Sequence, residues 1–248
     1  MPPMAISRKS ATSRRRQRGA ALLLLLAMTS VGAAAVLISA LGHDNGQQRR
    51  SALTLARMAQ ASEALVGFAA ANGRLPRPAA SATDGREAQA PCASEQACTG
   101  FLPWVTLGVD GGDGWGNLLR YSVTPTYTRA PVMRISAVAT KTISDRRADG
   151  QYEYRIGQSN CNLGAQCAPL VLLSHGQRNF GTSLLGVAQA NSAAGNLDEQ
   201  QNAADSVHFI GRALGADPAA PGGEFDDLVL SVPLSLLYQR MAAAHRLP

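Results

Sequence analysis

Residues 13–26 read Ser-Arg-Arg-Arg-Gln-Arg-Gly-Ala-Ala-Leu-Leu-Leu-Leu-Leu, so a single glycine, Gly19, separates a cluster of arginines from an apolar run. From Ala20 to Leu41 the chain has 22 residues without an ionisable side chain. As a helix this run would be about 33 Å long, which matches the roughly 30 Å hydrocarbon core of a bilayer. We therefore predict that residues 20–41 cross a membrane.

Positive charge is concentrated before this run. The formal net charge of the 248-residue chain is +6, and residues 1–19 contain six basic and no acidic side chains. The remaining residues carry 17 basic and 17 acidic side chains. By the positive-inside rule the N-terminus should lie in the cytoplasm and the rest of the chain outside. Net charge gives no support to a nucleic-acid-binding surface, and we expect no nucleic-acid partner.

The basic-to-apolar junction has three interpretations. A cleaved secretory signal would have a shorter apolar region; Ala33-Ala34-Ala35 could serve as its cleavage site, but the apolar run continues beyond it. A plain signal anchor would explain the hydrophobicity and the orientation, but not the single glycine between the two parts. A type IV prepilin leader, cut on the cytoplasmic side after a glycine, explains both.

Arg15-Arg-Gln-Arg-Gly19 followed by Ala20-Ala-Leu-Leu-Leu24 resembles the leader and mature start of type IV pilins and type II secretion pseudopilins. Segments farther along the chain also resemble parts of pseudopilin-like proteins; they are residues 64–76, 102–108, 113–121 and 240–248. The resemblance implies cleavage by prepilin peptidase between Gly19 and Ala20, with Ala20 becoming an N-methylated N-terminus.

The same resemblance implies location and partners. A protein of this class is a single-pass protein of the bacterial inner membrane with its head in the periplasm. It joins other pilin or pseudopilin subunits in a filament that serves type II protein secretion or a type IV pilus. We therefore expect the inner membrane, prepilin peptidase and sister subunits as partners.

Leu24 departs from the family pattern. Most pilins have a glutamate at this position, whose charge within the bilayer is thought to pair with the amino terminus of a neighbouring subunit. A carboxylate inside a membrane is costly and is retained where it has a partner. In lacking this glutamate, the chain resembles minor pseudopilins that lie at a filament tip. The alternative is that it is an atypical member of the family whose assembly does not use this contact.

The segment after the apolar run has a helical repeat. Between Gln47 and Asn72 a stripe of side chains recurs at spacings of three and four, formed by Leu55, Met58, Ser62, Leu65, Phe68 and Ala69. This spacing predicts an amphipathic helix that ends at Gly73, with Pro76 just beyond it. The stretch 42–46 predicts a kink at the membrane surface.

The predicted fold class is α+β and pilin-like. A long N-terminal helix spans the membrane with its first half and packs with its second half on a small antiparallel sheet, and a C-terminal helix completes the head. The predicted organisation is a prepilin-type leader (1–19), a transmembrane segment (20–41), the periplasmic half of the stem helix (42–75) and a periplasmic α+β head (76–248).

Strands are predicted where Val, Ile, Leu and Tyr gather between turn residues, at 118–124, 132–139, 152–156, 170–174 and 226–232. Residues 76–100 are predicted to be a loop. Within 179–223 only the short run 207–210 has strand-like composition. Pro233 suits the first turn of the final helix.

The four cysteines form two local pairs, Cys92 with Cys98 and Cys161 with Cys167. In an oxidising periplasm we expect disulfides, and proximity favours the two local pairings over the other possible ones. A zinc site built from all four cysteines is the alternative, but zinc ligand pairs usually stand closer together.

We predict that the chain is not an enzyme. The catalytic candidates are Ser174 and His175 with Asp226 and Asp227, together with the remaining histidines His43, His208 and His245. Adjacent residues on a strand point to opposite faces, which is poor geometry for a nucleophile and its base. The sequence has no nucleophile elbow, phosphate loop or metal-binding helix motif.

No cofactor and no metal are expected, with calcium as the alternative. The glycine-rich stretch 110–117 offers oxygen ligands but lacks the order of an EF-hand loop, so we interpret Asp113-Gly-Trp115-Gly as a structural turn. Major pseudopilins carry calcium in a late loop, and residues 174–179 with 224–227 are loosely similar to that region.

Overall fold

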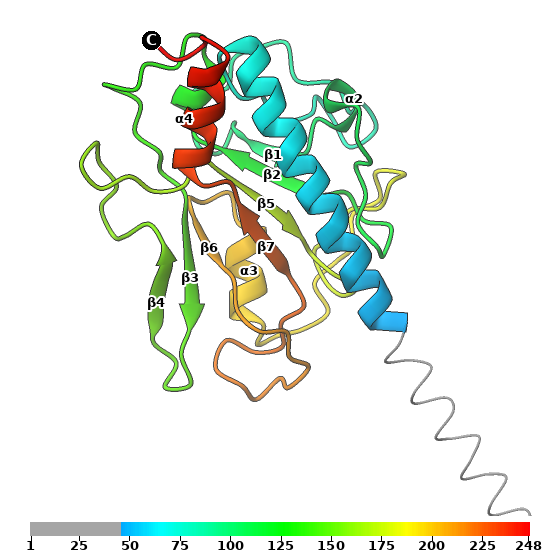
Figure 1. The fold of residues 1–248 in the computed structure, drawn as a ribbon. Helices are drawn as coiled ribbons and strands as arrows, with labels where there is room; N and C mark the ends of the chain where they lie inside the picture. Colours follow the sequence, from blue (N-terminus) through cyan, green and yellow to red (C-terminus); the bar gives the residue numbers. More distant parts are fainter. Residues whose placement is uncertain (1–45) are drawn as a thin grey trace, which may run out of the picture. The chain divides into compact units, whose positions relative to one another are not determined.

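A helix over residues 46–72 begins the part of the chain described by the computed structural model, which is residues 46–248 (Figure 1). One face of this helix is buried at spacings of three and four, through Thr54, Met58, Ala61, Leu65 and Ala69. The helix ends where Gly73 adopts a φ of +68° and donates its N–H to the carbonyl of Ala69 at 2.9 Å. The predicted helix and its cap are confirmed, although Leu55 is 48% exposed instead of buried.

The helix packs on a four-stranded antiparallel sheet. Its strands, in the spatial order β1-β2-β5-β7, are β1 (Thr99–Phe101), β2 (Arg120–Val123), β5 (Leu170–Ser174) and β7 (Leu228–Ser231). Tyr121 lies opposite Leu172, and Leu172 lies opposite Leu230, which sets the register across the centre. The sheet confirms the predicted strands near 118–124, 170–174 and 226–232. The predicted loop 76–100 ends earlier than expected, because β1 begins at Thr99.

A second, three-stranded sheet was not predicted. Its order is β4-β3-β6, formed by β4 (Tyr152–Ile156), β3 (Thr142–Arg146) and β6 (His208–Ile210). β3 pairs antiparallel with β4 but parallel with β6, so the predicted single antiparallel sheet is wrong in this part of the head.

The predicted strand 132–139 is also wrong. Pro131 precedes it, and Ser136 and Ala137 both donate their N–H groups to the carbonyl of Met133, which closes a turn. Val132 and Ala137 are buried singly against the core, so their apolar character reflects anchoring of a loop and not the alternation of a strand. The strand at this point of the chain, β3, starts a few residues later at Thr142.

Two hydrophobic clusters lie on opposite faces of β5. The helix over 46–72 and α4 (Leu234–Ala243) cover one face, where Leu170 and Leu172 join the larger cluster. Val171 and Leu173 point to the other face and pack with Ile143 and Phe209 of the second sheet. Because both faces are covered, β5 is buried at every position, as its continuous apolar sequence favours. The predicted C-terminal helix after Pro233 is confirmed.

Short elements complete the head. They are α2 (Trp104–Leu107), the 3₁₀ helix η1 (Pro125–Thr128) and α3 (Leu197–Ala203). Disulfides join Cys92 to Cys98 and Cys161 to Cys167, with Cα–Cα distances of 5.2 and 5.6 Å. These are the predicted local pairings, and because they use all four cysteines, the alternative four-cysteine zinc site is excluded.

Within residues 46–248 no helix is both long and apolar enough to cross a membrane. The predicted leader 1–19, the cleavage site at Gly19 and Ala20, the predicted transmembrane segment 20–41 and Leu24 lie outside the described residues.

Candidate functional site

The richest group of buried polar side chains lies where the loop after β5 meets the loop before β7. Gly176 lies so close to the second loop that a Cβ added to it would stand 2.4 Å from the carbonyl oxygen of Asp226. Its φ of +66° is also a conformation that side chains disfavour. Glycine at this position therefore lets the two loops, and with them the predicted residues 174–179 and 224–227, come together.

His175 is held by a buried carboxylate. Its Nδ1 lies 3.2 Å from Oδ1 of Asp227, and the two side chains are 5% and 1% exposed. Asn202 of α3 donates its Nδ2–H to Oδ2 of Asp227 at 2.8 Å, which fixes the carboxylate in turn. When Nδ1 carries the proton donated to Asp227, Nε2 is left with its lone pair available to a ligand.

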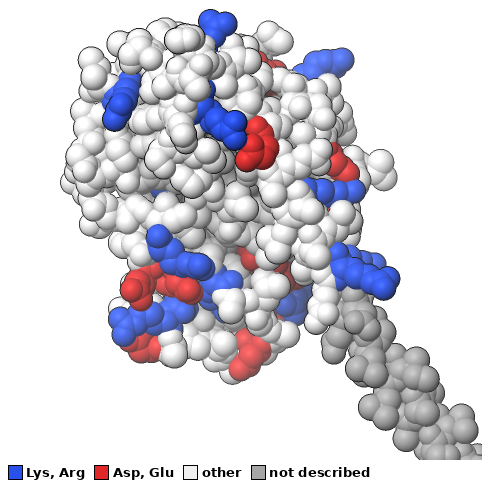
Figure 2. Space-filling model, viewed as in Figure 1, with Lys and Arg blue, Asp and Glu red and all other residues white. Residues whose placement is uncertain are grey.

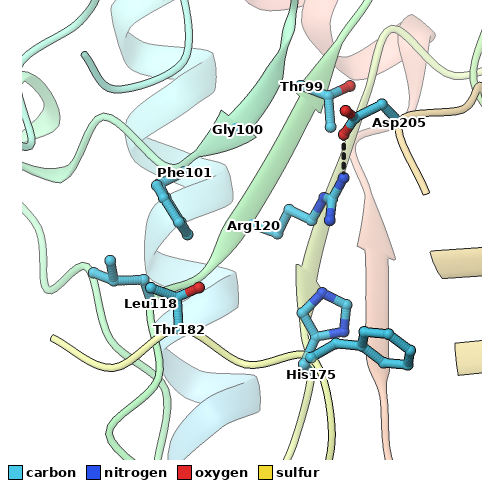
Figure 3. A pocket seen from close by; sticks show the side chains of 9 residues that line it. Thr99, Gly100, Phe101, Leu118, Arg120, His175, Thr182 and Asp205 are labelled. Atoms are coloured by element: carbon cyan, nitrogen blue, oxygen red, sulfur yellow. Dashed lines mark hydrogen bonds and ion pairs between the residues drawn. The ribbon is translucent and has the colours of Figure 1, made fainter. Parts of the chain in front are cut away.

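A small cavity of about 190 Å³ lies beside the histidine (Figure 3). Phe101 of β1 and Leu118 line its apolar side, and Arg120 of β2 and Asp205 line its charged side. Figure 3 shows the ring of His175 and the guanidinium group of Arg120 on the same side of the cavity. The cavity therefore combines an apolar wall with groups that donate and accept hydrogen bonds.

Arg120 is strongly constrained in this cavity. Its Nη1 donates to the carbonyl of Ala203 at 2.8 Å, and its Nη2 lies 2.5 Å from Oδ1 of Asp205. Its Nε is buried without a hydrogen-bond partner. Burial lowers the pKa of Arg120, while the charges of Asp205 and Asp227 oppose this shift. An arginine with an unused buried N–H is a group that a ligand could satisfy.

The geometry does not assemble a catalytic triad. Ser174 donates its hydroxyl to Oδ2 of Asp113 at 2.6 Å, whereas His175 pairs with Asp227 on a different side of the strand. This divergence is what alternation along β5 predicts. The arrangement suits binding of a small polar group or a side chain.

A carboxylate cluster lies next to the histidine. Glu199, Asp226 and Asp227 each place an oxygen within 4.8 Å of the others. Oδ2 of Asp226 accepts from the backbone N–H groups of Gln177 and Arg178, and its Oδ1 is buried without a partner. Burial, followed by the nearby charge of Glu199, raises the pKa of Asp226 to about 7.

Arg178 already neutralises part of this carboxylate cluster, which disfavours binding of a cation. Arg178 forms ion pairs with Glu224 at 2.9 Å and with Asp226 at 3.3 Å, so a positive charge already balances part of the cluster. A bound cation would need Asp226 to be deprotonated and would compete with Arg178. Residues 174–179 and 224–227, for which calcium was the alternative expectation, are thus in contact.

Asp113 forms the structural turn predicted for it. Its Oδ1 accepts the N–H groups of Trp115 and Asn117 at 2.8 and 2.9 Å, and its Oδ2 accepts from Ser174. Gly114 lies against the helix, since an added Cβ would stand 2.3 Å from the carbonyl oxygen of Arg50. The carboxylate of Asp113 thus closes the turn and ties it to β5, while Arg57 and Thr54 of the helix bind the carbonyl of Asp113 and the N–H of Gly114.

Several residues of the site were missed in the sequence. Arg120, Asp205 and Phe180 line the cavity, and Asn202 and Glu199 support the buried carboxylates. None belongs to a motif, and α3 falls in the segment 179–223 for which only one short run was predicted. The one available signal was Arg120, a charged residue inside an otherwise strand-like run.

Comparisons of the chain with protein-family models, with curated proteins and with solved structures found no match. Function is therefore inferred from the sequence and from the geometry of residues 46–248.

Proposed function

We propose that the chain is a minor pseudopilin-like or pilin-like subunit of a type II secretion pseudopilus or a type IV pilus. Prepilin peptidase cuts after Gly19, residues 20–41 hold the subunit in the inner membrane, and the head lies in the periplasm. The subunit then leaves the membrane by exchanging lipid for the apolar stems of neighbouring subunits.

The basic-to-apolar junction at Gly19 is the sequence feature that supports this proposal. The helix over 46–72 is the structural feature that agrees with it, because it begins five residues after the predicted span ends. One face of the helix packs against a four-stranded antiparallel sheet. This packing is expected of a stem helix that carries a head.

Two exposed leucines near the start of the described helix, on different sides of it, also agree with assembly. Leu53 and Leu55 are 45% and 48% exposed near the start of the described helix. Apolar side chains on a stem gain free energy when a neighbouring subunit covers them, at about 25 cal/mol per Å² of buried apolar surface.

Co-expression with a prepilin peptidase tests the processing step. We expect the wild-type chain and Gly32→Val, a change within the apolar run, to shift to a smaller mass by the loss of residues 1–19. Gly19→Val should keep the full mass, because the peptidase requires the small residue before the cut. Equal masses for the wild type and Gly19→Val in the presence of active peptidase would contradict the proposal.

A membrane-anchored periplasmic binding domain that does not polymerise is the second candidate. The cavity beside His175, with its available Nε2 and the unpartnered Nε of Arg120, favours it. Crosslinking in intact cells separates the two functions, because a filament subunit crosslinks to pilin or pseudopilin subunits and a solitary anchor does not.

A further inference from the structure

Four arginines lie together at the end of the head where the helix over 46–72 finishes. They form, with His245, what we call the basic face: Arg129, Arg134, Arg240 and Arg246. All five side chains belong to exposed residues. The segments that supply them, 124–140 and 232–248, contain no Asp or Glu.

Contacts between three parts of the chain bring these residues together. The guanidinium carbon of Arg134 lies 5.8 Å from the ring centre of Tyr238 on α4, the helix that also carries Arg240. A Cβ on Gly73 would lie 3.6 Å from the carbonyl oxygen of Arg246 and 4.0 Å from Cβ of Ala130. Arg129 precedes Ala130 directly, so Arg129 and Arg246 lie at the end of the helix, while Arg134 and Arg240 lie beside and on α4.

The charges of the basic face are uncompensated. Most arginines in the described part of the chain form an ion pair with an acid, as Arg57, Arg146 and Arg178 do. Within residues 46–248 the four arginines of the basic face form no ion pair and no side-chain hydrogen bond. The nearest acid in the helix is Glu63, about 14 Å before the helix end. In Figure 2 the top and upper left of the molecule show separate blue groups among white ones, while red groups lie beside blue ones in the centre, at the right and at the lower left.

The basic face also has an apolar centre and a hollow. Ile135 is 79% exposed and Met133 is 42% exposed, between Arg129 and the core residue Ala137. A cavity of about 570 Å³ lies at the end of the helix over 46–72, lined by Asn72, Gly73, Ala130, Pro131, Ala242, His245, Arg246, Leu247 and Pro248. Arginine and methionine are enriched in protein interfaces. Such interfaces usually have an apolar centre surrounded by polar and charged groups.

We propose that the basic face binds an acidic, extended segment of another protein, with its carboxylates on the arginines and an apolar side chain against Ile135. A second copy of this chain is a poor partner, because its acidic side chains are mostly engaged, as Asp198 is by Arg146 and Arg212. Nucleic acid would use the charges but would leave Ile135 and Met133 without a partner. The inference is independent of processing at Gly19, since the basic face belongs to residues 46–248.

Binding of a fluorescent acidic peptide to the purified full-length chain in mild detergent tests this proposal. The peptide carries glutamates around a central leucine pair, and a matched peptide has glutamine at every glutamate. We expect the acidic peptide to bind at least tenfold more tightly than the glutamine peptide, and increasing salt to weaken its binding. Arg134→Glu with Arg246→Glu should lower the affinity by roughly tenfold or more.

Two further variants make the test specific. Ile135→Asp should weaken binding of the acidic peptide, because it removes the apolar contact and adds a like charge. The matched control, Arg86→Glu with Arg147→Glu, reverses two exposed arginines elsewhere on the head and should leave the affinity unchanged. Melting temperatures of all variants report whether the head stays folded; none of the substituted residues is buried.

Other outcomes would overturn the proposal. Absence of acidic-peptide binding, or binding that the basic-face variants leave unchanged, removes it. Tighter binding to duplex DNA, or to phosphatidylglycerol vesicles, than to the peptide would assign the basic face to a different class of partner.

Discussion

The buried polar residues around His175 show how single side chains hold this head together. Asp227 receives hydrogen bonds from His175 and Asn202, and Asn202 also donates to the carbonyl of Ile210 at 2.9 Å and accepts its N–H at 2.7 Å. Buried polar groups stabilise a fold when each has a partner. Oδ1 of Asp226 and Nε of Arg120 are exceptions in this group.

Asp226 should make the stability of the head depend on pH. Its pKa is raised to about 7 from an ordinary value of 3.8, so the folded state binds a proton more tightly than the unfolded state. The free energy of unfolding should therefore fall as pH rises from about 4 to about 7, and this contribution should level off above pH 7. Denaturant melts across this pH range measure the effect.

Asp226→Asn should flatten that dependence, because asparagine does not titrate. Asp217→Asn, at an exposed acid, is the matched control and should keep the wild-type profile. An unchanged profile in Asp226→Asn would show that Asp226 is not the titrating group.

Asp227→Ala should destabilise the head by about 2–4 kcal/mol, because it leaves His175 and Asn202 buried without their acceptor. Chemical denaturation measures this loss. Glu153→Ala removes an exposed acid of β4, outside this group of buried residues, and should cost under about 1 kcal/mol. Equal losses in the two variants would contradict the account of the buried pair.

The end of the helix over 46–72 depends on its glycine cap. Two glycines of the helix over 46–72 and its C-terminal cap lie in different environments: Gly73, directly after the helix, has a φ of +68°, whereas an added Cβ on Gly67 within the helix would meet nothing within 4 Å. The helix therefore needs glycine at its end but not at Gly67.

Gly73→Ala should lower the stability of the head by about 1 kcal/mol, because alanine disfavours the left-handed conformation. Gly67→Ala should raise it by roughly 0.5–1 kcal/mol, since alanine is the better helix former. Opposite signs in equilibrium unfolding are the expected result; a loss of similar size at both positions would contradict the cap assignment.

The two disulfides should contribute unequally to the stability of the head. Cys98 is fully buried and Cys92 nearly so within the main core, whereas Cys161 is only half-buried. Replacing Cys92 and Cys98 by serine should cost about 2 kcal/mol from loop closure, together with the burial of two hydroxyl groups. The same change at Cys161 and Cys167 should cost less, as thermal melts of the two double variants would show.

Elements with strong local signals were predictable from the sequence. The repeat over 47–72, the glycine cap and the continuous apolar run of β5 each depend on nearby residues. β1 is only three residues long and is defined by its partner strand, so no local pattern indicates it, whereas the equally short β6 lies within the strand-like run 207–210. The segment 132–139 was misassigned because buried loop anchors resemble strand residues in composition.

The candidate site was predictable only in part. Ser174, His175, Asp226 and Asp227 attract notice by residue type, and the structure brings their loops together. Arg120 and Asp205 meet across 85 positions of the chain, which no spacing argument could indicate.

In the proposed filament, each subunit contacts its neighbours along the stem. Leu53→Asp should leave the melting temperature almost unchanged, because the side chain is already 45% exposed, but should abolish incorporation into filaments. Val105→Asp on α2, at a residue 49% exposed, is the matched control and should assemble normally. Sheared-filament preparations measure incorporation; equal recovery of both variants would contradict a role for the stem.

The most direct test is the intact mass of the protein isolated from the membranes of its own cells. The account predicts a chain that begins at Ala20, with the mass of one methyl group added and both disulfides formed. A chain that retains Met1, or one that begins after Ala35, would contradict it.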